Sequence, residues 1–266
     1  MPRLDLILAR NLGLSRSAVT RLLRAGRVRD PDGTRLDDGR LQLPPSTLPR
    51  TVWVDGEPCT LSCRAELLLH KPVGVVTALR DDRHPTAFAL VKDAPLPREL
   101  RAVGRLDLDT SGLLLWTTDG TLLHRLTHPR YAIPRTYHAA LTEPFGSPPP
   151  GLQLDDGHRP DIVALTAEPA EAMHPALVAV AGARCHASIT ITSGRFHEVR
   201  RIFAALGSHV LALCRVQFGP ITLPHALAAG RWIPIDLRAH FRGIAPRDDG
   251  DAIDDRDDDD GPAPDS

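Results

Sequence analysis

One stretch of this chain joins an acidic loop to a short apolar run, and that combination limits how the chain can fold. Residues 104–112 read Gly-Arg-Leu-Asp-Leu-Asp-Thr-Ser-Gly, and residues 113–117 read Leu-Leu-Leu-Trp-Thr. The apolar run predicts a buried strand that ends at Asp119-Gly120, a strong turn signal. Carboxylates at the mouth of such a strand are costly to desolvate unless something pairs with them. The loop is therefore a candidate functional site.

The charge of the chain is unevenly distributed. The formal net charge is -1, but the segment from residue 248 to residue 266 holds ten Asp and one Arg. The remainder has 31 Lys and Arg against 23 Asp and Glu, a net charge of +8, which is typical of a protein that binds a polyanion. Most of the cations are Arg, which suits bidentate contact with phosphate, although genomic base composition is the simpler explanation of that bias.

Composition divides the chain into three parts. We predict a small domain over residues 1–60, a large domain over residues 66–245 and an acidic disordered tail over residues 246–266, with a link over residues 59–65. The tail is too polar to bury a core, and a solvating role explains it better than competition with a polyanion for the basic part. A monomer is the default expectation.

Several classes of protein are disfavoured by the sequence. It has no apolar run of about 18 residues, so we expect no membrane span. The first residues carry an acid and no long apolar core, which disfavours a secretory signal and favours the cytoplasm. The spacings of Cys59, Cys63, Cys185 and Cys214 match no common zinc pattern, so we expect free thiols and no metal.

The first 60 residues predict two short helices. Leu4, Leu8 and Leu12 form a helical stripe, Ser15 is a suitable N-cap for a second helix, and Gly26 is a suitable stop. One face of the second helix is rich in arginine and suits an RNA backbone, although an ordinary solvated face has the same appearance. The residues at helical spacing on that face are Arg16, Thr20, Arg24 and Arg27.

Three strings in this part resemble the S4-type RNA-binding domain. They are Arg-Leu-Asp at residues 3–5, Leu-Ser-Arg-Ser at residues 14–17 and Ala-Gly-Arg-Val at residues 25–28. The resemblance covers about the first 55 residues. It departs at residues 29–33, which read Arg-Asp-Pro-Asp-Gly where that family has a Val-Asn-Gly turn. The resemblance implies RNA contacts by Arg3, Arg16, Arg24 and Arg27.

The large part alternates short apolar runs with turns, which favours an α+β fold over regular βαβ alternation. Strands are predicted at residues 67–69, 113–117, 137–141 and 187–191, and helices at residues 121–126 and 197–206.

Four segments of the large part resemble the pseudouridine synthase family, in the order in which that family has them. They are residues 69–76 (Leu-His-Lys-Pro-Val-Gly-Val-Val), residues 104–112, residues 135–137 (Arg-Thr-Tyr) and residues 194–203 (Gly-Arg-Phe-His-Glu-Val-Arg-Arg-Ile-Phe). With the S4-like start, the resemblance spans about residues 1–240. It implies a mixed, mainly antiparallel sheet with flanking helices. It also implies isomerisation of uridine to pseudouridine, without metal or redox cofactor.

The same resemblance assigns the site residues. Asp107 matches the essential aspartate, and Arg200 the arginine that pairs with it and keeps it charged and oriented. Tyr137 matches the tyrosine that packs against the target base. Arg105 matches the arginine that helps to hold the substrate when the uridine is extruded, a step that costs stacking energy.

Three more basic residues are predicted to bind substrate. Lys71 precedes a proline and is expected in an extended segment, where it suits a phosphate contact. Arg195 and Arg201 flank the Arg200 string. Position 198 is Glu where the family commonly has Gln, and we expect Glu198 to point away from Arg200. Asp109 and Thr110 are expected to shape the loop by bonding nearby backbone N–H groups.

The predicted substrate is ribosomal RNA, either free or in an assembling ribosomal subunit. Residues 81–86 and 203–223 are most similar to family members that act on the small subunit's 16S rRNA, and a 23S rRNA enzyme is the close alternative. An RNA-binding assembly factor without activity is an alternative of another class. An Asp-x-Asp phosphatase is a further one, but both lysines lie upstream of that motif and no apolar strand precedes it.

Overall fold

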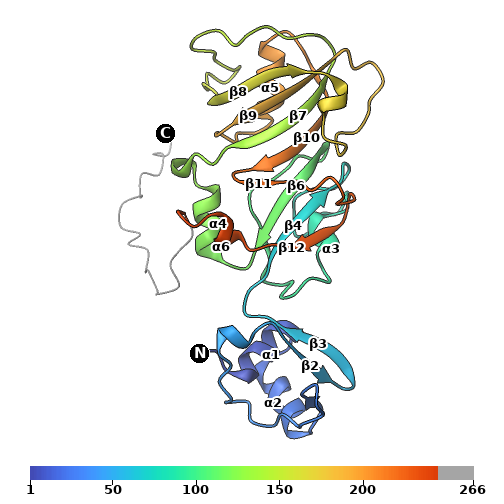
Figure 1. The fold of residues 1–266 in the computed structure, drawn as a ribbon, viewed down its shortest axis with the longest axis vertical. Coiled ribbons are helices and arrows are strands. Elements are labelled where there is room, and N and C mark those ends of the chain that lie inside the picture. The colour runs from blue at the N-terminus through green and yellow to red at the C-terminus, as the bar shows by residue number, and fades with distance from the viewer. Residues whose placement is uncertain (245–266) are drawn as a thin grey trace.

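The structure is a computed structural model that describes residues 1–244, so the predicted acidic tail lies outside the described residues. Figure 1 shows a small unit of two helices and a hairpin and a large unit built on a long sheet. A single segment of the chain connects the two units. Within residues 1–244, no helix has the length and apolar character needed to cross a membrane.

The small unit packs two helices on a three-stranded sheet. Leu4, Leu8, Val19 and Leu23 are buried in one apolar cluster, as the helical stripes predict. The Ser15 hydroxyl caps the second helix by accepting a hydrogen bond from the Ala18 N–H. The elements are α1 (Leu4–Leu12), α2 (Arg16–Arg24), β1 (Val28–Arg29), η1 (Pro45–Thr47), β2 (Arg50–Val54) and β3 (Glu57–Leu61), and the sheet order is β1-β2-β3.

Hydrogen bonds from α1 hold the connection between the two units. β3 continues to Leu61, so the link is residues 62–65, shorter than expected. The Asn11 side chain exchanges two hydrogen bonds with the backbone of Ser62. Arg10 donates to both carboxylate oxygens of Glu99 in the large unit, at 2.8 and 2.6 Å.

The large unit is built on a nine-stranded mixed sheet in the order β12-β4-β6-β10-β7-β9-β8, with β5 and β11 paired to its central strands. All its pairs are antiparallel except β6 with β10, which confirms the mixed, mainly antiparallel sheet. The strands are β4 (Glu66–Lys71), β5 (Arg101–Ala102), β6 (Thr110–Thr117), β7 (Arg135–Leu141), β8 (Ile162–Glu168), β9 (Cys185–Ile191), β10 (Val210–Phe218), β11 (Ile221–Thr222) and β12 (Trp232–Pro234).

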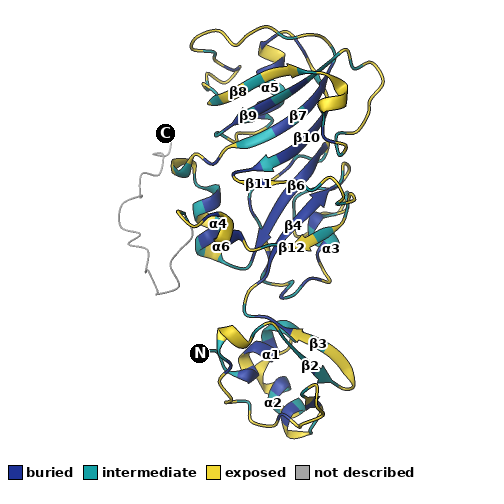
Figure 2. Ribbon diagram, in the orientation of Figure 1, coloured by how far each residue is buried: buried dark blue, intermediate teal, exposed yellow. Residues whose placement is uncertain are grey.

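Apolar side chains cover both faces of the sheet's centre. On β6, Leu114 and Trp116 join one cluster while Leu113 and Leu115 join the other, because successive side chains point to opposite faces. Figure 2 shows β4 and β6 buried throughout and β8 largely exposed. Helices α3 (Ala87–Leu90) and α5 (Glu198–Ala205) contribute to the first cluster, and α4 (Gly120–Thr127) and α6 (Leu237–His240) to the second. Short 3-10 turns occur at η2 (Pro129–Tyr131) and η3 (Ala170–Ala172).

The buried strand ends where predicted, because β6 stops at Thr117, but the Asp119-Gly120 pair starts a helix and not a turn. Gly120 is the first residue of α4, and the Asp119 carboxylate caps that helix by accepting from the Leu122 N–H. An Asp before an apolar periodic segment is also a helix-start signal, and the packing of Leu122 and Leu126 under the sheet favours the helix.

Gly112 allows β6 and β10 to approach closely. Its φ is 112°, and a Cβ there would lie 2.3 Å from the backbone oxygen of Arg215, its register partner on β10. Neither the conformation nor the space admits a side chain. The two strands that carry the candidate site therefore require glycine at this position.

Replacing Gly112 by alanine should destabilise the fold by about 3 kcal/mol or more, because the new methyl group forces the strands apart and φ is unfavourable. For a protein of this size, that lowers Tm by about 6 to 12 °C. Gly120→Ala is the matched control, since nothing lies within 4 Å of its added Cβ and its φ is ordinary. Equal melting temperatures for the two variants would contradict the close approach.

Candidate active site

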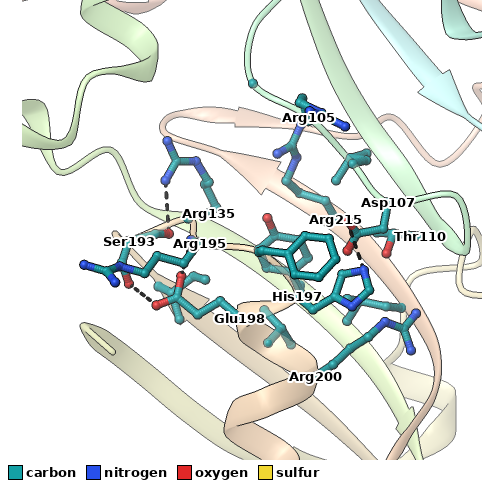
Figure 3. A pocket seen from close by; sticks show the side chains of 18 of the residues that line it. Arg105, Asp107, Thr110, Arg135, Ser193, Arg195, His197, Glu198, Arg200 and Arg215 are labelled. Atoms are coloured by element: carbon teal, nitrogen blue, oxygen red, sulfur yellow. Dashed lines mark hydrogen bonds and ion pairs between the residues drawn. The ribbon is translucent and has the colours of Figure 1, made fainter. Parts of the chain in front are cut away.

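A cleft of about 780 Å³ opens in the large unit. The loop before β6, strands β7 and β10 and the start of α5 form its walls, as Figure 3 shows. It brings together residues that lie far apart in the sequence. Of the predicted site residues, Arg105, Asp107, Tyr137, Arg195 and Arg200 line the cleft, whereas Lys71 and Arg201 do not.

Asp107 lies in the loop that leads into β6. Its backbone oxygen accepts from the Thr110 N–H at 3.1 Å. The Thr77 hydroxyl exchanges two hydrogen bonds with the backbone of Leu106, which fixes the loop from the other side. The Asp107 carboxylate is about one-third exposed, and its Oδ1 lies 3.7 Å from Nε2 of His197. The carboxylate is thus partly open to the cleft.

The structure corrects the predicted partner of Arg200. Arg200 lies 2.9 Å from the Asp109 carboxylate, and it also donates to the Val210 carbonyl at 3.2 Å. Figure 3 shows His197 between Asp107 and Arg200, which explains why the predicted pair does not form. Asp109 forms an ion pair with this arginine, whereas the prediction was that it accepts hydrogen bonds from nearby backbone N–H groups. Arg200 therefore holds the loop through Asp109.

Lys71 was predicted to contact phosphate, but it is fully buried. Its ammonium group donates to the carbonyls of Pro72, at 3.0 Å, and Thr110, at 2.7 Å. Burial lowers the pKa of Lys71 to about 8, although the charges of Asp107 and Asp109 act in the opposite direction. The residue ties the end of β4 to the start of β6 and places a cation beneath the acidic loop.

Arg201 was predicted to bind substrate, but it points away from the cleft. Its guanidinium group donates to Asp155 at 2.6 Å and pairs with Asp156. A hydrogen bond from Arg201 lowers the pKa of Asp156 to about 2. Consecutive residues on a helix point about 100° apart, so Arg200 and Arg201 cannot face the same side.

Glu198 points away from Arg200, as predicted. It is buried and accepts hydrogen bonds from His158, the Ser193 hydroxyl and the Arg195 N–H, at 2.7 to 2.9 Å. Two of these donors belong to the loop that precedes α5, and His158 belongs to the segment between β7 and β8. The glutamate therefore shapes this wall of the cleft and leaves Arg200 to Asp109.

Tyr137 lies on β7 in register with Arg215 of β10. It is largely buried and still lines the cleft, so one surface of its ring is available at the base of the site. This position fits the predicted packing against a base.

Sequence reasoning gave no role to several residues of the cleft, among them Arg135, His197 and Arg215. Arg135 donates to the carbonyls of Thr192 and Ser193, and burial lowers its pKa. Arg215 is buried in the middle of β10, and a charge in an apolar strand was the signal that could have revealed it. His197 has a left-handed φ of 49°, and its ring stacks on Phe196, with ring centres 3.8 Å apart.

The four arginines predicted to bind RNA in the small unit differ in their surroundings. Arg3 and Arg16 both donate to Asp5, and Arg27 pairs with Asp55 beyond the end of α2. Arg24 is exposed and forms no ion pair within the described chain. Burial by itself raises the pKa of Asp5, but the hydrogen bond from Arg16 and the two cationic charges hold it below its ordinary value. Two of the arginines thus neutralise a buried acid.

Comparison with known proteins identifies the family. Residues 66–205 match the family described as RNA pseudouridylate synthase. The chain belongs to this family. It is 38% identical to the ribosomal small subunit pseudouridine synthase A of Yersinia pestis over 234 residues, covering 88% of this chain and 94% of that protein. It is 35% identical to the protein of the same name from Escherichia coli K12 over 242 residues, covering 88% and 96%.

A solved structure agrees with this assignment. A crystal structure of a pseudouridylate synthase is 30% identical, with a TM-score of 0.54, and the match covers 90% of this chain and 98% of that one. The predicted enzyme class, an RNA pseudouridine synthase, is confirmed. The alternatives of an Asp-x-Asp phosphatase and of an RNA-binding assembly factor without activity are wrong.

Proposed function

We propose that this enzyme isomerises one specific uridine of 16S ribosomal RNA to pseudouridine. The observation that supports the proposal is one cleft lined by Asp107, by Tyr137 and by the exposed arginines Arg105 and Arg195. Relatives with 35% and 38% identity are named small subunit enzymes, which favours 16S over 23S rRNA. We expect the enzyme to act in the cytoplasm as a monomer, on rRNA or on an assembling subunit.

The reaction needs a group that acts on the ribose, a surface that packs against the base and groups that hold the extruded nucleotide. Residues of the cleft suit each of these three tasks. Asp107 acts on the ribose of the target uridine, because it is the carboxylate at the open side of the cleft. Tyr137 packs against the base at the floor. Arg105 and Arg195 are exposed at the rim, where guanidinium groups contact phosphates or replace the stacking that the extruded uridine loses. Arg200 positions the loop through Asp109.

Replacing Asp107 by asparagine should lower the isomerisation rate by about 10³-fold or more, the scale expected when a nucleophile or general base is lost. RNA affinity should stay nearly unchanged, because asparagine has the same size. The rate is measured on 16S rRNA transcripts, and affinity by filter binding. Asp93→Asn is the control, because Asp93 is an exposed acid that does not line the cleft. A parallel fall in affinity and rate would contradict the catalytic role of Asp107.

We further propose that residues 1–60 form an S4-like RNA-binding domain that supplies salt-dependent affinity. Exposed arginines of α2 support this, since Arg21 and Arg24 face solvent. The hydrogen bonds of Arg10 to Glu99 hold this domain against the large unit. A backbone-binding domain so placed positions the RNA, and the cleft selects the uridine.

Replacing Arg24 by glutamine should weaken RNA binding and reduce the slope of log Kd against log salt concentration by about 1, the effect of one lost phosphate contact. The rate at saturating RNA should not change. Arg184→Gln is the matched control, because Arg184 is an exposed arginine of the large unit that pairs with Glu143. The RNA-binding role of α2 is wrong if both variants have the wild-type slope.

A further inference from the structure

Buried side-chain atoms of three cleft residues lack a hydrogen-bond partner. One of these residues, Arg200, already forms an ion pair with Asp109. The other two atoms are Nη2 of Arg215 and the hydroxyl of Thr110, in residues only 2% and 1% exposed. Both residues line the cleft. They lie on adjacent strands, since β6 and β10 pair at Gly112 and Arg215. Unpartnered polar groups on two adjacent strands of one cleft indicate a ligand that satisfies both.

Arg215 is held in place by its own surroundings. Its Nε donates to the Leu113 carbonyl at 2.8 Å, and its guanidinium carbon lies 5.5 Å from the centre of the Phe218 ring. Figure 3 shows its side chain between those of Arg135 and Asp107. The free donor is thus preorganised and does not depend on a flexible surface side chain.

The charges around Arg215 make it suited to an oxygen acceptor. It forms no ion pair with a carboxylate in the described part of the chain, and the buried cation Lys71 is close enough to be coupled to it. A buried donor or cation without a partner costs folding free energy, and a guanidinium group has only donors. A carbonyl oxygen that becomes negative during the reaction would satisfy it at the step where the energy matters most.

Arg135 offers a useful contrast within the same cleft. Its guanidinium carbon lies 5.2 Å from the centre of the same Phe218 ring, but its Nη1 already donates to two backbone carbonyls. Arg135 therefore uses its guanidinium group to hold the loop before α5, whereas Nη2 of Arg215 has no partner in the described chain. The difference favours Arg215 over Arg135 as the buried arginine that binds substrate.

We propose that Arg215 and Thr110 bind the uracil ring, with Arg215 donating to a carbonyl oxygen and stabilising the charge that the ring acquires when the C1′–N1 bond breaks. This inference rests on the proposed function. The electron pair of that bond stays on uracil and spreads over N1 and both carbonyl oxygens. C5 then uses an electron pair of the ring to form the C1′–C5 bond, which removes the negative charge from the ring. C5 finally loses its proton and N1 gains a proton, which gives pseudouridine. Arg215 only donates hydrogen bonds and keeps its protons.

The first test measures single-turnover rates for Arg215→Met and Arg215→Lys. The methionine variant should be slower by about 10²-fold, the scale for one lost oxyanion donor, with RNA affinity unchanged. The lysine variant keeps the charge and should recover part of the rate, and it also serves if the methionine variant folds poorly. Arg184→Met is the matched control, which should be as fast as the wild type. Full activity of Arg215→Met would overturn the proposal.

The second test asks whether Arg215 touches a carbonyl oxygen. RNAs with 2-thiouridine or 4-thiouridine at the target position replace one carbonyl oxygen by sulfur, a weaker acceptor. In the wild type, sulfur at the oxygen that Arg215 contacts should lower the rate. In Arg215→Met the same replacement should have no effect, because the hydrogen bond that sulfur weakens is already absent. If the two effects simply multiply at both positions, Arg215 does not contact the base and the proposal is wrong.

Thr110→Val separates a substrate-binding role from a structural one. Valine has nearly the same shape and removes a buried hydroxyl without a partner, so Tm should stay the same or rise while the rate falls. A lower Tm with an unchanged rate would assign Thr110 to the fold and overturn its place in the proposal. Wild-type enzyme that is inactive on every unmodified rRNA would instead overturn the proposed function, and this inference with it.

Discussion

The parallel contact between β6 and β10 is the constraint on which the site depends. The two strands meet at Gly112 and Arg215 so closely that no side chain fits between their backbones. This contact puts the acidic loop at the start of β6 above a buried arginine of β10. The antiparallel pairing of β10 with β7 then brings Tyr137 to the same floor. One glycine thus gathers three parts of the sequence into one cleft.

Electrostatics complete the arrangement. The loop has two carboxylates, and each has a separate basic neighbour: Asp107 faces His197, and Asp109 pairs with Arg200. Lys71 adds a buried cation below the loop. Because Arg200 holds Asp109, the carboxylate of Asp107 stays partly open to the cleft. A buried Arg215 without a carboxylate partner leaves an excess of positive charge where an RNA substrate has its own negative groups.

The sequence predicts the fold class and much of the cleft wall, because both follow from local patterns. Apolar runs place β4, β6, β7 and β9, and the motif order places Asp107, Tyr137 and Arg200 near one another. The sequence does not predict which side chains form ion pairs, because the direction in which each side chain points is set by the packing of the folded chain. Lys71 turned inward to two carbonyls because the end of β4 is buried on both faces.

Register and helix rotation explain the remaining differences. Arg201 follows Arg200 by one residue and therefore faces Asp155 and Asp156 outside the cleft. Arg215 has its register partners Gly112 on β6 and Tyr137 on β7, so its place in the cleft depends on pairing between distant parts of the sequence. Glu198 was predictable because a buried acid beside basic residues needs donors, and the loop before α5 supplies them.

The measurement that tests the central claim most directly is pseudouridine mapping of total rRNA from cells with and without this gene. The account predicts that one position in 16S rRNA loses its pseudouridine and that all other positions stay modified. Restoring the gene should restore that position, and restoring the Asp107→Asn form should not. Loss at a 23S position would contradict the assigned substrate and keep the chemistry. Unchanged modification throughout the rRNA would contradict site-specific rRNA isomerisation itself.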